Sequence, residues 1–219
     1  FDSLSAGNYR VEVLGSNFDA GEDLENLLSS TGANEEVAPN NDGDSNDNGI
    51  DEVSGAIRSR IVTIGALEPT GETEPGTYAS GSTTGNAAAD GFSNLTVDFG
   101  FYKPGSISGL SWLDLNRNGL RENDESFISD TVFLLNQLDQ HVAGTVTSDD
   151  GKYYFDNLRP GSYRVLFSLP DTSFELTSKL VGLDRTIDSD AGDVMGRLIT
   201  DQIAITSGHD VINIDAGFS

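Results

Sequence analysis

The stretch FDSLSAGNYRV at residues 1–11 returns as FDNLRPGSYRV at residues 155–165, and seven of the eleven positions are identical. A second pair of segments repeats in the same order, VDFGF at residues 97–101 and IDAGF at residues 214–218. The first pair is offset by 154 residues and the second by 117, so the first copy holds 37 additional residues between its two landmarks. An internal repeat of this kind predicts two structural units that share one architecture.

The boundary between the copies is predicted at Lys103 and Pro104, directly after the closing motif of the first copy. It divides the chain into residues 1–103, the C-terminal part of a first domain, and residues 104–219, a complete second domain. A linker of about three residues that contains proline is short and stiff, so we expect restricted hinge motion.

The first copy differs from the second in two ways. Its additional residues fall in sequence that is typical of long surface loops, at residues 42–52 and 68–90. It also lacks a counterpart of residues 105–154. Half a sandwich does not bury its sheet, so we expect the missing strands to come from preceding residues of the same protein or from another polypeptide.

Alternation of apolar and polar side chains predicts short strands in both copies. In the first copy they are expected at residues 9–13, 57–64 and 95–99. In the second copy they are expected at residues 106–113, 131–138, 142–148, 152–155, 162–169, 198–206 and 210–218. Seven such strands with Gly-, Asp- and Asn-rich turns are typical of an antiparallel immunoglobulin-like sandwich. The predicted fold class is all-β, with two tandem sandwiches of which the first is N-terminally incomplete; residues 20–30 suggest one helical turn.

The charge of the chain limits what it can bind. Asp and Glu number 36 against 12 Lys and Arg, which gives a formal net charge of −24, and Cys is absent. A strongly negative field opposes binding to nucleic acid and to anionic membranes, whereas divalent cations are attracted. No apolar run approaches the ~20 residues of a membrane span, so no membrane insertion is expected.

Residues 114–125 match the twelve-residue calcium-loop template D-x-[DN]-x-[DN]-G-x5-E at every position. Calcium takes six to eight hard oxygen ligands, and alternate residues of a tight loop can direct oxygens to one point. The predicted ligands are the side chains of Asp114, Asn116 and Asn118, the carbonyl of Leu120, Glu122 through water, and Glu125 with both carboxylate oxygens. The preceding residues resemble a strand, so the loop is expected on a β scaffold.

A second acidic segment lies at the same place between landmarks in each copy. In the second copy its candidate ligands are Asp188, Asp190 and Asp193. In the first copy they are Asp42, Asp44, Asn46 and Asn48. Their spacing fits either a second calcium site in each domain or a solvated acidic loop.

Five motifs occur in a fixed order in the second copy. They are W-x-D-x-N-x-N-G at residues 112–119, T-x-D-D-G-x-Y-x-F at 147–155, F-x-x-L-x-P-G-x-Y-x-V at 155–165, an acidic loop at 188–193 and D-x-G-F at 215–218. This order resembles the calcium-binding B repeats of serine-aspartate surface adhesins. The first copy matches from F-x-x-L onward, with Ala6 in place of the proline. The resemblance implies a collagen-adhesin B-type, immunoglobulin-like sandwich on the bacterial surface, in which calcium stiffens tandem modules into a stalk.

The function predicted from these observations is a calcium-stabilised stalk or spacer in an extracellular bacterial protein, either secreted or held on the cell surface. Its partners are expected to be calcium ions and neighbouring repeats of the same protein. One alternative is a filament subunit whose first domain is completed by strands of another chain. A second is an adhesive module that binds a host protein or glycan through residues 68–90. An enzyme is not expected.

Overall fold

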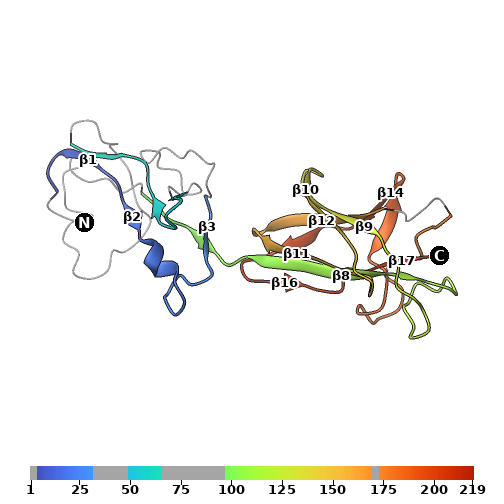
Figure 1. The fold of residues 1–219 in the computed structure, drawn as a ribbon. Helices are drawn as coiled ribbons and strands as arrows, with labels where there is room; N and C mark the ends of the chain where they lie inside the picture. The colour runs from blue at the N-terminus through green and yellow to red at the C-terminus, as the bar shows by residue number, and fades with distance from the viewer. Residues whose placement is uncertain (1–3, 32–48, 66–96, 169–172) are drawn as a thin grey trace. The chain divides into compact units, whose positions relative to one another are not determined.

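The computed structural model describes residues 4–31, 49–65, 97–168 and 173–219. Contacts divide the chain into two compact units, Phe1–Tyr102 (unit 1) and Lys103–Ser219 (unit 2). Both units are built from strands, and the helix found within the described ranges is the short 3-10 helix η1 (Gly15–Phe18) (Figure 1). The chain is therefore all-β, as the alternation in its sequence predicts.

Unit 2 consists of two sheets. The larger has the strand order β10-β9-β12-β14-β13, and β15 pairs with the first part of β12. The smaller has the order β11-β8-β16, and β17 pairs with β8 farther along, both β16 and β17 running parallel to β8. The strands are β8 (Gly105–Leu113), β9 (Thr131–Asn136), β10 (His141–Val146), β11 (Lys152–Leu158), β12 (Gly161–Phe167), β13 (Ala191–Val194), β14 (Arg197–Thr200), β15 (Ile203–Ile205), β16 (Asp210–Val211) and β17 (Ala216–Phe218).

The core of unit 2 lies between these sheets and follows from the two-residue period of a strand. Along β12, Tyr163, Val165 and Phe167 are buried and the residues between them are not. Tyr153 and Phe155 of β11 face them from the smaller sheet. The ring of Tyr153 lies 5.6 Å from that of Phe155 and 5.7 Å from that of Phe167, centroid to centroid, which is the spacing of attractive aromatic pairs.

The segment between β16 and β17 passes very close to β8 at Gly109. A Cβ atom at this position would lie 1.9 Å from the carbonyl oxygen of Ile214. The parallel pairing with β8 is interrupted between β16 and β17. Gly109 lies opposite this interruption, where only glycine fits.

The described residues of unit 1 form three small sheets, β1-β6, β2-β5-β4 and β3-β7. Their strands are β1 (Gly7–Tyr9), β2 (Glu12–Val13), β3 (Leu28–Ser29), β4 (Ile50–Asp51), β5 (Ile57–Arg58), β6 (Val62–Ile64) and β7 (Phe101–Tyr102). Among these described residues, the buried apolar ones are Ala56, Ile57, Val62 and Tyr102.

The repeated sequence has the same strand register in both units. β1 pairs with β6 as the start of β12 pairs with β15, and β2 pairs with β5 as the end of β12 pairs with β14. The matched pairs are Gly7–Ile64 with Gly161–Ile205, Tyr9–Val62 with Tyr163–Ile203, and Val13–Ile57 with Phe167–Leu198. Residues 7–13 and 161–167 thus encode one local structure.

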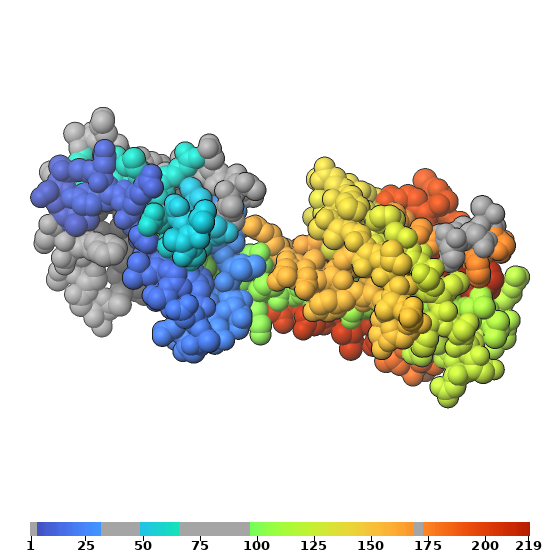
Figure 2. All heavy atoms as spheres, in the orientation of Figure 1, coloured from blue at the N-terminus to red at the C-terminus, as the bar shows by residue number. Residues whose placement is uncertain are grey.

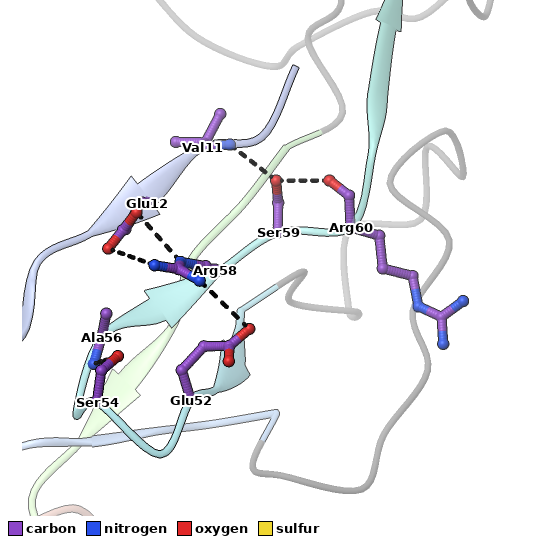
Figure 3. Close-up of polar contacts among 8 residues, drawn as sticks. All are labelled: Val11, Glu12, Glu52, Ser54, Ala56, Arg58, Ser59 and Arg60. Carbon is purple, nitrogen blue, oxygen red and sulfur yellow. Dashed lines mark hydrogen bonds and ion pairs between the residues drawn. The ribbon is translucent and has the colours of Figure 1, made fainter. Parts of the chain in front are cut away.

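Two predicted strands are each split at a hydroxyl-bearing residue. Residues 57–64 form β5 and β6, and the break begins at Ser59, whose Oγ accepts the Val11 N–H at 3.0 Å and donates to the Arg60 carbonyl at 2.8 Å (Figure 3). Residues 198–206 form β14 and β15, and Oγ1 of Thr200 accepts the Val165 N–H at 3.0 Å. At both breaks a side-chain oxygen accepts the N–H in place of a backbone carbonyl of the neighbouring strand. The alternation of apolar and polar residues does not reveal this replacement.

Three other predictions from the pattern were wrong. Residues 97–99 are not a strand, and β7 begins only at Phe101. Residues 20–27 form turns without helix, whereas a helical turn occurs earlier, at η1. A strand, β13, also forms where the acidic sequence predicts a loop, because the backbone of Ala191–Val194 pairs with β14.

Candidate metal centre

The loop of residues 114–125 begins at the end of β8 and is anchored by Asp114, which is 1% exposed. The N–H of Asp114 donates to the carbonyl of Phe218 in β17 at 2.7 Å. Its carboxylate accepts a hydrogen bond from the hydroxyl of Thr177. The first residue of the calcium template therefore connects β8, the last strand and the segment around residue 177.

Side-chain oxygens of the first half of the loop accept N–H groups of the loop itself. The N–H of Asn118 donates to Oδ1 of Asp114 at 3.2 Å and to Oδ1 of Asn116 at 3.0 Å. The N–H of Leu120 donates to Oδ1 of Asn118 at 2.7 Å. Gly119 has φ +80°, and its N–H reaches Oδ2 of Asp114 at 2.8 Å, so glycine is the residue that suits this turn.

The two glutamates close the loop from its other end. Glu125 accepts the Leu115 N–H at 2.8 Å with Oε1, and the Glu122 N–H at 3.0 Å with Oε2. Glu122 accepts a hydrogen bond from the side-chain amide of Asn118 through Oε1, and its Oε2 is buried without a partner among the described residues. An orphaned, buried carboxylate oxygen is the kind of group that a cation satisfies.

The second acidic segment lies against this loop. Leu120 forms an antiparallel bridge with Asp188, and the N–H of Arg121 donates to the Ile187 carbonyl at 2.7 Å. Figures 1 and 2 show the loop of residues 114–125 and the segment of residues 180–190 at the same end of unit 2, the end that carries β17. Two candidate sites that are about 70 residues apart in the sequence are thus neighbours.

Asp190 and Asp215 are joined by two hydrogen bonds. The N–H of Asp215 donates to Oδ2 of Asp190 at 2.9 Å, and the N–H of Asp190 donates to the Asp215 carbonyl at 2.8 Å. Oδ1 of Asp215 in turn accepts the Leu110 N–H of β8 at 2.9 Å. Asp215 and Thr177 are hydrogen-bonded to the candidate ligands Asp190 and Asp114, although the sequence did not select them; the D-x-G-F motif was the available signal for Asp215.

Comparison with known proteins identifies this architecture. The sequence profile of the SdrD B-like domain matches residues 105–218. The chain belongs to this family. The chain is 34% identical over 145 residues, 65% of its length, to serine-aspartate repeat-containing protein F of Staphylococcus epidermidis. It is 34% identical over 143 residues, 64% of its length, to serine-aspartate repeat-containing protein E of Staphylococcus aureus.

The chain spans only 8% and 12% of the length of these two relatives. Among solved structures, the minor pilin GBS52 of Streptococcus agalactiae matches 78% of this chain and 67% of its own, with 9% identity and a TM-score of 0.34, a likeness too low to add to the assignment. Within the described residues, no helix is long and apolar enough to cross a membrane.

Burial sets the protonation of the acids in the SdrD B-like domain. Burial raises the pKa of Asp215 to about 7, although the Leu110 N–H opposes the shift, and the nearby Asp190 carboxylate adds to it. Burial likewise raises the pKa of Asp190 to about 6, with a further contribution from Asp188. These carboxyl groups resist losing their protons unless a positive charge is close.

The remaining predicted ligands lie elsewhere. Asp193 is exposed at the end of β13, where Oδ1 accepts the Gly196 N–H at 2.7 Å in the turn to β14. The first-copy residues Asp42, Asp44, Asn46 and Asn48 lie outside the described residues.

The donors of the SdrD B-like domain fit calcium in kind. The loop gathers carboxylate and amide oxygens, which a hard cation prefers, and one of them is orphaned. Across the described ranges, however, no three Asp, Glu, His or Cys side chains converge closely enough to form a metal cluster by themselves. A calcium ion bound here would therefore need asparagine and backbone oxygens as well as the acids.

Proposed function

We propose that the chain forms two tandem domains of SdrD B type that act as a calcium-stabilised spacer in an extracellular bacterial surface protein. The family assignment and the serine-aspartate repeat relatives support a surface-protein repeat. The shared strand registers of units 1 and 2 support a tandem arrangement, with residues 1–103 as part of a first domain and residues 104–219 as a complete second one.

The observation that carries the calcium proposal is the attachment of the 114–125 loop to other parts of unit 2. Asp114, Asn116, Asn118 and Glu125 would hold the ion through side-chain oxygens, Leu120 through its carbonyl and Glu122 through water. Calcium supplies two positive charges to a chain whose net charge is −24. Asp188 and Asp190 lie on the adjoining segment and are the candidates for a second position.

The protein residues then transmit the stabilisation. Asp114 is bonded to β17 and to Thr177, and Leu120 is paired with Asp188, so the loop cannot open without disturbing both segments. A ligand that binds only the folded loop stabilises the domain by about 2.7 kcal/mol when its concentration is 100 times Kd. Extracellular calcium modules have Kd values of roughly 10⁻⁴–10⁻³ M, so the stabilisation depends on the surroundings. In tandem repeats such stiffening favours an extended spacer.

Isothermal titration calorimetry of calcium tests this proposal. We expect saturable binding to the full chain and its loss in the double variant Asp114→Ala, Glu125→Ala. Asp124→Ala is the matched control, because Asp124 is an exposed acid of the same loop and is not a predicted ligand. Equal binding by all three proteins would show that the 114–125 loop does not bind calcium.

A second function is favoured by one observation on unit 1. In unit 2, β9 pairs with β12 along residues 163–167. No strand of the described residues pairs in this way with the equivalent segment, residues 9–13. A strand from another polypeptide could add there and build a filament. Light scattering across a concentration series distinguishes the two functions, since a filament subunit assembles and a spacer stays monomeric.

The third hypothesis, adhesion through residues 68–90, concerns a segment that lies outside the described residues.

A further inference from the structure

One carboxylate of unit 2 is fully buried and is paired with a cation from its own chain. The side chain of Asp188 is 0% exposed, and its Oδ2 accepts a hydrogen bond from Nη1 of Arg185. Its Oδ1 has no hydrogen-bond partner among the described residues. Asp188 is therefore half satisfied, in a place where an unpaired charge is costly.

Other cations near Asp188 make different contacts. Lys179 donates from Nζ to both carboxylate oxygens of Asp201 at 3.0 Å. Arg121 donates from Nη2 to the Thr186 carbonyl at 3.4 Å. Arg185 is accordingly the residue that forms an ion pair with Asp188 in the part of the chain that the structure describes.

The exposure of Arg185 allows it to break its ion pair with Asp188. Its side chain is 53% exposed, and residues 182–186 around it are exposed as well. A guanidinium at such a position regains water when it leaves, whereas the buried Asp188 cannot. Breaking the ion pair is therefore costly for the carboxylate and not for the arginine. Another cation that reaches Asp188 can replace Arg185.

Asp188 also lies where a second cation is expected. It is bridged to Leu120 of the 114–125 loop, and Asp190, two residues farther along, is joined by two hydrogen bonds to Asp215. Three acids thus share this region, and Asp188 among them is paired with the half-exposed Arg185.

We propose that Arg185 is a tethered counter-cation for the Asp188 carboxylate and that a divalent, oxygen-preferring cation displaces it. Arg185 keeps the folded domain intact when the metal is scarce, and its displacement reduces the apparent affinity for the metal. The inference rests on the proposed calcium binding and adds a regulating residue to it.

The test compares Arg185→Gln with the matched control Arg197→Gln in the full chain. Arg197 is also a half-exposed arginine in an ion pair, but it contacts Asp139. Each protein is melted in excess EGTA and in excess calcium, and its calcium affinity is measured by calorimetry.

We expect Arg185→Gln to lower the melting midpoint in EGTA, to reach the wild-type midpoint in calcium, and to bind calcium about tenfold more tightly, equivalent to ~1.4 kcal/mol. Arg197→Gln should leave the calcium response unchanged. If Arg185→Gln does not fold in EGTA, Arg185→Lys is used instead, because it keeps the charge. Its calcium affinity should lie between the wild-type value and one that is about tenfold tighter.

Equal losses of midpoint in EGTA and in calcium, with unchanged affinity, would show that the ion pair is only structural and would overturn the inference while calcium binding stands. A wild-type chain that does not respond to calcium would overturn the proposed function, and this inference with it.

Discussion

Units 1 and 2 build the repeated sequence in the same way. The hydroxyl of Tyr9 donates to the Ser5 carbonyl at 2.7 Å, and that of Tyr163 donates to the Arg159 carbonyl at 2.9 Å. A hydroxyl oxygen accepts a strand N–H at the equivalent break in both units, from Ser59 in one and from Thr200 in the other. The repeated motif therefore specifies a strand pair and its break, whatever surrounds it.

The two units place their acids differently. In the described part of unit 1, Glu12 and Glu52 pair with Arg58 at the surface, with side-chain exposures of 33%, 35% and 37% (Figure 3). In unit 2, Asp114, Asp188 and Asp215 are at most 1% exposed. Charges at the surface are screened, whereas buried ones must be compensated. The strands thus explain what the units share, and the acidic loops explain how unit 2 is expected to respond to cations and protons.

The largest effect is expected from Asp114→Ala, which removes the acceptor of Thr177, Asn118 and Gly119 from a buried site. We predict a loss of about 3–5 kcal/mol in the stability of unit 2, because the remaining donors are left unpaired. Urea denaturation measures it, with Asp124→Ala as the exposed control in the same loop. A loss below that of ordinary surface substitutions would mean that Asp114 does not anchor the loop.

The next effect is a dependence on pH in the absence of metal. The folded-state pKa values of Asp215, about 7, and Asp190, about 6, lie above the ordinary value, so the folded domain binds these protons more tightly than the unfolded chain. Their contribution is present at pH 4 and is lost as pH rises through 6 and 7. We expect unit 2 to lose roughly 2–4 kcal/mol between pH 4 and pH 8.

Denaturation in EGTA across this pH range measures the slope. Asp215→Asn should remove the largest single share of it, because asparagine keeps the acceptor for the Leu110 N–H and carries no titrating proton. A stability that rises with pH over the same range would contradict the assignment.

Part of this organisation is readable in the sequence. Strands β8, β9, β10, β11 and β12 were predicted from short runs in which apolar and polar residues alternate, and the 114–125 loop because its oxygens follow a known spacing. β13 was missed because its Asp and Gly residues carry no alternation. It exists through pairing with β14, which is a tertiary property.

The joining of the two acidic segments was also not predictable. Leu120 and Asp188 meet only after the sandwich has closed, and no periodicity relates them. Thr177 reaches Asp114 for the same reason. Sequence spacing therefore predicted candidate ligands, whereas which of them lie together depended on the fold.

Removal of the shared hydroxyl acceptors should have a moderate effect in each unit. Thr200→Val leaves the Val165 N–H unpaired in a buried site, and we expect a loss of about 1–3 kcal/mol in unit 2. Ser59→Ala should cost unit 1 less, because the Val11 N–H is only partly buried. Native-state hydrogen exchange reports both units separately. A larger loss for Ser59→Ala would reverse this order.

The smallest effect is expected from Arg58→Ala, although Arg58 contacts both Glu12 and Glu52. Hydrogen bonding to Glu12 raises the pKa of Arg58, but the guanidinium is in water, where ion pairs contribute little. We predict a change close to the error of a urea denaturation, and smaller still at high salt. A loss comparable to that of Thr200→Val would show that surface pairs sustain unit 1.

The most direct test is hydrogen–deuterium exchange of the full chain with excess calcium and with excess EGTA. If calcium holds the 114–125 loop against the last strand, exchange in calcium should slow at residues 114–125, at residues 187–190 and at β17, and calcium should have no such effect in Asp114→Ala. Identical exchange of these three segments in calcium and in EGTA would contradict the account.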